Sequence, residues 1–165
     1  MGGLLLRTGD AKEALRHLEQ ALALSKRSPN QVFEARIRLS LGNAYIQLGR
    51  EANALESSAT GLAMARKVRH LPLEAEALTA IAECHLSGGN LARAGDSFSK
   101  GLELAEQIGL TPVALSARRG LAETALRRGD LHGALARLRA AMEALEAMRS
   151  RLLAPDLRAG FVHEN

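Results

Sequence analysis

The chain has 165 residues, a formal net charge of +4 and an apolar fraction of 47 %. It holds 30 Ala and 30 Leu but only three Phe, one Tyr and no Trp, a composition that favours helices and excludes an all-β fold. The apolar fraction is too high for a disordered chain, and apolar runs such as residues 4–6, none longer than four residues, are too short for a membrane span or a signal peptide. With a single cysteine and no membrane segment, we expect a cytoplasmic protein in a reducing compartment.

A period of forty residues runs along the chain. Glycine recurs at this spacing, and each of these glycines is followed five residues later by alanine. The two columns are Gly9, Gly49, Gly89 and Gly129, and Ala14, Ala54, Ala94 and Ala134. The earlier part of the unit repeats as Leu41-Gly42, Ile81-Ala82 and Leu121-Ala122. We interpret the chain as an array of internal repeats.

Each unit is predicted to contain two helices. The first helices run over about 32–48, 72–88 and 112–128, and the second over about 11–27, 51–69, 91–109 and 131–152. The repeated glycine fits the left-handed position that ends a helix, and Asp10, Asn90 and Asp130 after it are good N-caps. We also expect Thr111 to cap a helix that has Pro112 at its first position. A turn of one or two residues makes the two helices antiparallel neighbours.

Small residues are predicted where the helices cross. Ala54, Ala94 and Ala134 lie early in the second helices, and a larger side chain there would overpack the contact. Larger apolar residues then fill the space between neighbouring pairs, and they include Leu18, Phe98 and Leu138. Such a unit cannot bury its apolar face alone, so the units must stack.

The pattern Leu41-Gly42-x-x-Tyr45, followed by Gly49, Ala54 and Gly61, resembles the tetratricopeptide repeat, in its long-helix variety with forty residues per unit. The later units keep most of these positions, but Arg38, Leu78 and Arg118 stand where the family usually has tryptophan. The resemblance implies an all-α fold, a right-handed α-solenoid. It places an array over 1–153, with a half repeat at 1–30 and full repeats at about 31–70, 71–110 and 111–152.

The two ends of the chain depart from the repeat. Only residues 4–8 precede Gly9, so we expect the chain to start inside a repeat. Residues 154–165 are expected to be the start of a missing segment. They resemble the segment after tetratricopeptide arrays in bacterial proteins with a caspase-like CHAT protease domain, or in multidomain regulatory proteins.

No catalytic, metal or cofactor site is predicted. Cys84 and His85 are adjacent on a helix and diverge by about 100°, so they cannot act as nucleophile and base. The remaining histidines lack metal-ligand spacing; they are His17, His70, His132 and His163. Residues 111–165 carry nine Arg against six acidic residues, a small excess without the interleaved aromatics that stack on bases, so we expect no nucleic-acid partner.

The resemblance implies that the first helix of each unit lines a concave groove that binds a peptide or helix of another protein. By register the groove residues are Arg36, Leu39, Asn43, Ile46 and Gln47, then Glu76, Thr79, Glu83 and Leu86, then Ser116, Arg119, Glu123, Leu126 and Arg127. The lysines and asparagines of a clamp for chaperone C-termini are absent from these columns except for Asn43. We expect a ligand that is amphipathic or carries both charge signs.

Three interpretations of the function follow. The first is a protein-interaction scaffold without enzymatic activity. The second is a self-assembly module, in which Leu15, Leu18 and Leu22 of the half repeat are partly uncovered and drive homo-oligomer formation. The third is the regulatory arm of a larger multidomain enzyme such as a CHAT-type protease.

Overall fold

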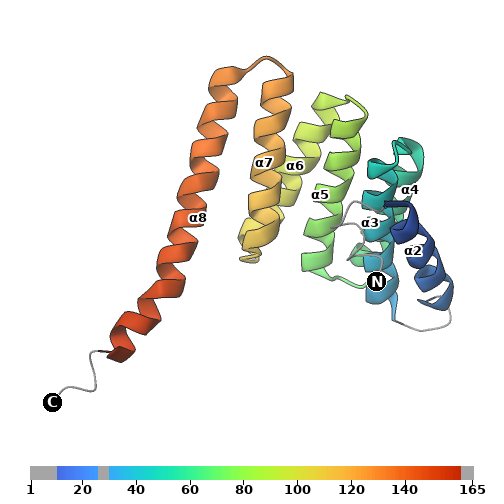
Figure 1. The fold of residues 1–165 in the computed structure, drawn as a ribbon, viewed down its shortest axis with the longest axis horizontal. Helices are drawn as coiled ribbons and strands as arrows, with labels where there is room; N and C mark the ends of the chain where they lie inside the picture. Colours follow the sequence, from blue (N-terminus) through green and yellow to red (C-terminus); the bar gives the residue numbers. More distant parts are fainter. Residues whose placement is uncertain (1–10, 26–29, 161–165) are drawn as a thin grey trace.

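The structure, a computed structural model, describes residues 11–25 and 30–160. These residues form seven helices and no strand (Figure 1). In chain order the helices are α2 (Ala11–Ser25), α3 (Gln31–Gln47), α4 (Glu51–Lys67), α5 (Leu71–Ser87), α6 (Leu91–Gln107), α7 (Thr111–Arg127) and α8 (Leu131–Gly160). The predicted first helices are confirmed one residue earlier than expected. The last helix is longer than predicted: it continues past residue 152 and ends at Gly160.

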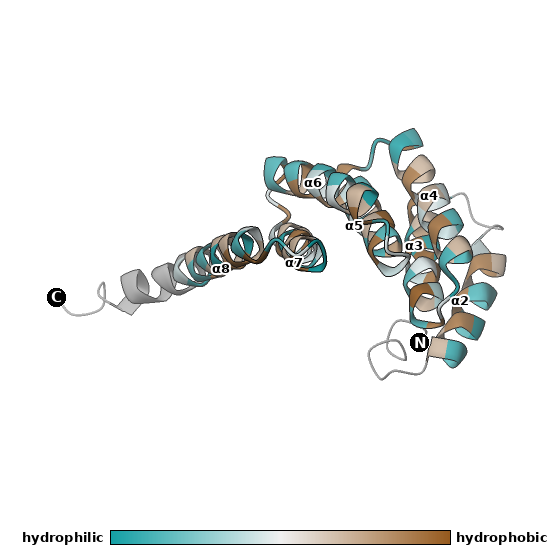
Figure 2. Ribbon diagram, turned by 90° about the horizontal axis from the view of Figure 1, so that it is seen from above, coloured by the Kyte–Doolittle hydropathy of each residue, from teal (hydrophilic) through white to brown (hydrophobic). Residues whose placement is uncertain are grey.

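The helices form a stacked array of antiparallel pairs, α3 with α4, α5 with α6 and α7 with α8, and α2 packs on α3 (Figures 1 and 2). Helices α3, α5 and α7 also contact one another in succession, whereas α4, α6 and α8 make no comparable contacts among themselves. We call α3, α5 and α7 the inner layer and α4, α6 and α8 the outer layer. Because the helices of the inner layer lie closer together than those of the outer layer, the stack curves with the inner layer on its concave side.

The repeated glycines end the first helices as predicted. The φ angles of Gly49, Gly89 and Gly129 are 68°, 73° and 81°, in the left-handed region that glycine adopts without strain. The N–H of the next residue then donates to a carbonyl five residues back, as from Asn90 to His85 at 2.8 Å. Gly9 and its neighbour Asp10 lie outside the described residues.

The same turn also joins one repeat to the next, which the sequence analysis missed. Gly109 and Arg69 occupy its left-handed position, with φ angles of 70° and 54°. The N–H of Leu110 donates to the Ala105 carbonyl at 2.7 Å, and the N–H of His70 donates to the Ala65 carbonyl at 2.9 Å. Both turns of a repeat therefore reverse the chain by the same hydrogen-bond pattern.

The predicted N-caps are confirmed at Asn90 and Asp130, whose Oδ1 atoms accept N–H groups of the first helical turn at 3.2 and 2.8 Å. The predicted cap at Thr111 is wrong. Because Gly109 places the turn one residue earlier, Leu110 occupies the cap position and makes no side-chain cap bond. His70 was not predicted as a cap, and its Nδ1 accepts the Leu73 N–H at 3.2 Å.

Small residues lie at the helix crossings as predicted. Ala54 and Ala94 are fully buried, and Ala134 is 5 % exposed. Phe98 is buried against Gly120, where an added Cβ would collide with its ring. The sequence did not predict this pairing of a large and a small residue between α6 and α7.

Two expectations about the larger apolar residues are wrong. Leu15 and Leu18 are not left uncovered, because they are buried against Ile37 and Leu41 of α3. At the other end of the array, Leu138 of α8 is 45 % exposed, because no described helix packs on that side of α8.

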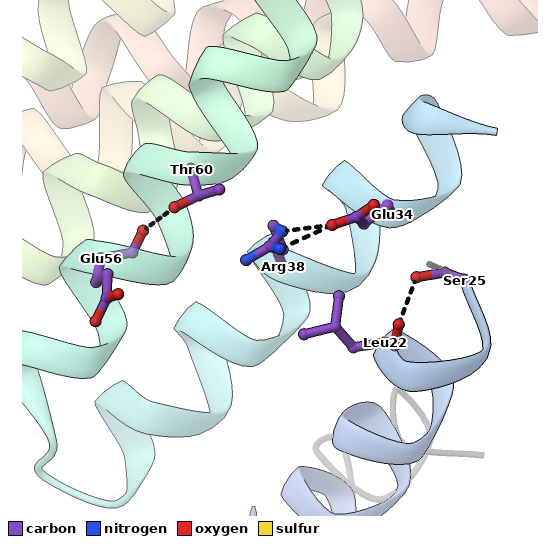
Figure 3. Close-up of polar contacts among 6 residues, drawn as sticks. All are labelled: Leu22, Ser25, Glu34, Arg38, Glu56 and Thr60. Carbon is purple, nitrogen blue, oxygen red and sulfur yellow. Dashed lines mark hydrogen bonds and ion pairs between the residues drawn. The ribbon is translucent and has the colours of Figure 1, made fainter. Parts of the chain in front are cut away.

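Polar side chains at the helix surfaces are paired locally (Figure 3). Arg38, in the column where the family has tryptophan, forms an ion pair with Glu34 one turn earlier at 2.7 Å. The hydroxyls of Ser25 and Thr60 donate to backbone carbonyls of the preceding turn at 2.9 and 2.8 Å.

Candidate functional site

A cavity of about 290 Å³ opens on the inner layer, and we call it the groove cavity. All three inner helices contribute to its wall. It brings together seven of the predicted groove residues, namely Arg36, Leu39, Asn43, Glu76, Thr79, Glu83 and Ser116. Ser40, Ala80, Pro112 and Val113 complete the lining. Ser40 and Ala80 occupy the same position in their repeats, directly after Leu39 and Thr79. The repeat register could therefore have identified both as groove residues.

Two polar groups of the residues that line the groove cavity are partly or fully removed from water, and one of them, the Asn43 amide oxygen, lacks a partner. The Oδ1 atom of Asn43 is buried and accepts no hydrogen bond from the described residues, an arrangement that ordinarily costs stability. Burial raises the pKa of the Glu83 carboxyl, Arg119 lowers it and Glu123 raises it again. The Thr79 hydroxyl, in contrast, has a partner, because it donates a hydrogen bond to the Ala75 carbonyl at 3.1 Å.

The charged residues of the groove cavity form no short ion pair, although the charge of Arg119 attracts Glu83. Within the described part of the chain, no ion pair involves Arg36, Glu76 or Glu83. The half-buried carboxylates of Glu76 and Glu83 lie two helical turns apart on α5, on the same face. The cavity thus offers hydrogen-bond acceptors and charges of both signs along its length.

Three further predicted residues lie elsewhere, in a second cavity of about 400 Å³ between α7 and α8, the end cavity. These residues are Arg119, Glu123 and Leu126. Its other lining is apolar and consists of Ala122, Leu131, Ala134, Leu135 and Leu138. The guanidinium of Arg127 is held nearby by the Glu123 carboxylate at 2.6 Å and by the Leu86 carbonyl at 3.0 Å.

The assignment of Leu86 to the groove surface is corrected by the structure. Leu86 is 6 % exposed and packs in a cluster with Ala94 and Phe98 of α6. Leu39 also belongs to the core, where it packs against Ala65, although its edge reaches the groove cavity. Ile46 is half-buried and Gln47 exposed, and neither lines a described cavity.

Cys84 and His85 lie beside a third cavity, of about 190 Å³, between α4 and the end of α5. Burial raises the pKa of the Cys84 thiol, so the sulfur is held neutral beside the Ser58 hydroxyl at 3.8 Å. Burial and the charge of Arg93 lower the pKa of His85. A neutral buried thiol is a poor nucleophile.

The described residues contain no group of three or more His, Cys, Asp or Glu side chains arranged to hold a metal ion. None of the described helices has both the length and the apolarity of a bilayer span.

Solved structures with a similar fold include a crystal structure of aspartyl phosphate phosphatase F from Bacillus subtilis, with a TM-score of 0.78, 15 % identity and 98 % of this chain covered. A crystal structure of BtubC (BKLC) from P. vanneervenii has a TM-score of 0.75 and 18 % identity over 90 % of this chain. The chain spans 40 % and 61 % of those two proteins. At these identities the likeness shows the fold, an α-solenoid of helix pairs.

No curated protein matches the sequence. Two family models described as tetratricopeptide repeat match residues 1–67 and 57–107, and together they span about two thirds of the chain. The chain therefore belongs to the tetratricopeptide repeat family, whose arrays serve as protein-interaction scaffolds.

Proposed function

We propose that the array binds a peptide segment of another protein in the groove cavity of the inner layer, and that it does so without catalysing a reaction. The observation that carries this proposal is the groove cavity itself, an opening of about 290 Å³ whose wall comes from all three inner helices and carries Arg36, Glu76 and Glu83.

The lining indicates the chemistry of the ligand. Glu76 and Glu83 favour a basic side chain, and Arg36 at the α3 edge favours an acidic one, so the charges would orient the peptide along the groove. Val113 and Pro112 supply apolar contact at the α7 edge. The charged side chains then set the direction of the ligand, while apolar burial supplies most of the affinity.

The absence of catalysis is proposed from the state of the reactive groups. The Cys84 thiol is buried and its pKa is raised, and no base lies within hydrogen-bond reach of it among the described residues. The unpaired cysteine also supports a reducing, cytoplasmic location.

A matched pair of substitutions tests the binding proposal. Peptides would be selected from a random display library on the full chain, and their dissociation constants measured by calorimetry. We expect Glu83→Gln to weaken binding at least tenfold, about 1.4 kcal/mol, because it removes a partly desolvated charge from the groove. The control Glu103→Gln makes the same change at an exposed position of α6 in the outer layer and should leave binding unchanged.

Failure would take one of two forms. If the library yielded no peptide that binds the full chain, the array would not be a peptide receptor. If peptides bound but Glu103→Gln weakened them and Glu83→Gln did not, the binding face would lie on the outer layer.

A further inference from the structure

An apolar stripe runs along α8. Leu131, Leu135, Leu138, Met142 and Leu145 are each between 45 and 63 % exposed. Their spacing alternates between four and three residues, which is the heptad spacing of a coiled-coil seam. Five large apolar side chains in one line on one helix form a contiguous patch of the kind that marks an interaction surface.

The stripe differs from the faces that hold the repeats together. One period earlier, the same columns of α6 pack against α7 through Phe98 and through the fully buried Ala105, which lies in a cluster with Ala114. In α8 the column of Ala105 holds Leu145, and the column of Gly95 holds Leu135. A helix that approached α8 as closely as α7 approaches α6 would collide with these leucines. The stripe suits the wider spacing of a coiled coil.

The charges beside the stripe favour a second copy of α8 in the opposite direction. Arg139 lies just N-terminal to residue 140, which is midway between Leu135 and Leu145, and Glu143 and Glu146 lie on the C-terminal side of residue 140. None of these three residues takes part in an ion pair within the described residues. A parallel copy would place like charges at the same height, whereas an antiparallel copy places Arg139 of one chain near Glu146 of the other.

The register of this pairing follows from the seam. If the two helices cross at residue 140, Leu138 of each copy meets Met142 of the other, and Leu135 meets Leu145. Side chains on a helix lean toward its N-terminus, so Arg139 of one copy and Glu146 of the second converge along the seam. The register therefore gives four apolar layers flanked by two ion pairs.

We propose that two copies of the chain associate through α8, antiparallel and with the twofold axis near residue 140. This self-association goes beyond peptide binding and is independent of it, because α8 contributes no residue to the groove cavity. It also moves the predicted self-assembly surface from the buried leucines of α2 to the opposite end of the array.

Sedimentation velocity across a concentration series tests the association. The full chain should show a concentration-dependent monomer–dimer equilibrium, and Leu138→Glu should raise the dimer dissociation constant at least tenfold while the circular dichroism stays helical. Leu24→Glu is the matched control, since Leu24 is 66 % exposed on α2, outside the seam. A chain that stays monomeric throughout, or a dimer that only Leu24→Glu disrupts, would overturn the proposal.

A charge reversal tests the orientation. Arg139→Glu should weaken the dimer, and the double variant Arg139→Glu/Glu146→Arg should restore it, because the swapped charges meet again only in the antiparallel register. Nitroxide labels on Arg149→Cys should lie about 27 Å apart, eighteen residues at 1.5 Å each. Labels within about 15 Å, or a double variant as weak as the single one, would contradict the antiparallel pairing.

Discussion

Glu83 lies at the groove cavity, with its carboxylate partly removed from water and its attraction to Arg119 opposed by Glu123. Asn43 holds an acceptor there without a donor from the described residues. Both features cost folding free energy, whereas an apolar lining of the same shape would not. Unfavourable groups of this kind are expected where a surface is adapted to a ligand and not to the isolated fold.

The raised pKa of Glu83 gives a pH-dependent prediction. A carboxyl whose pKa is raised by folding stabilises the protein when protonated, and this contribution is lost as the pH rises through the raised pKa. At pH 7 we therefore expect Glu83→Gln to melt at a higher temperature than the wild type. The gain should vanish below pH 4.5, the ordinary pKa, where both side chains are neutral. Thermal denaturation at both pH values checks this, and a variant less stable than wild type at pH 7 would contradict it.

At the scale of the element, the two turns of each repeat share one geometry but not one residue type. Glycine occupies the left-handed position at Gly49, Gly89, Gly109 and Gly129, whereas Arg69 adopts it at a φ of 54°. A side chain with a Cβ is strained in this region by about 1–2 kcal/mol. The turn persists at Arg69 because the His70 N–H bond to Ala65 and the packed helices α4 and α5 fix the chain there.

Relief of this strain should be measurable. We expect Arg69→Gly to raise the free energy of unfolding by about 0.5–1 kcal/mol, less than the full strain because glycine also gives the unfolded chain more freedom. Val68→Gly is a suitable control, since Val68 precedes Arg69 in the same turn, has an ordinary φ of −92° and should gain nothing. Urea denaturation gives both values, and a loss of stability in Arg69→Gly would mean that its side chain, not the turn, matters at this position.

The helices and most of their ends could be predicted because glycine and alanine recur at fixed positions in every unit, and cap residues such as Asn90 and Asp130 mark some of the helix starts. The turn at Arg69 could not, since nothing in an arginine indicates a left-handed conformation. The repeat register predicted which groove residues share one face of a helix, but it did not predict which of them are exposed to solvent. Leu86 and Leu126 share a column, yet one is 6 % exposed and the other 55 %. Leu86 packs in a cluster with residues of both α6 and α7, whereas Leu126 lies at the open end cavity between α7 and α8. Register fixes where a residue points, and only the neighbouring helices decide what covers it.

At the scale of the whole molecule, the array separates two surfaces of different chemistry. The inner layer carries a cavity with charges of both signs, and α8 carries an apolar stripe at the end of the stack. The outer helices α4 and α6 hold the inner layer in register through small residues such as Ala54 and Ala94. A ligand in the groove cavity would bridge α3, α5 and α7, three helices that otherwise contact only their immediate neighbours.

Amide hydrogen exchange of the full chain, measured with and without a selected peptide, tests whether the ligand binds in the groove cavity. Binding in the groove cavity should slow exchange in all three inner helices, over 31–47, 71–87 and 111–127, because one ligand holds them together. Exchange in α4 and α6 should change much less. Protection confined to α4 and α6, with the inner layer unchanged, would contradict the account.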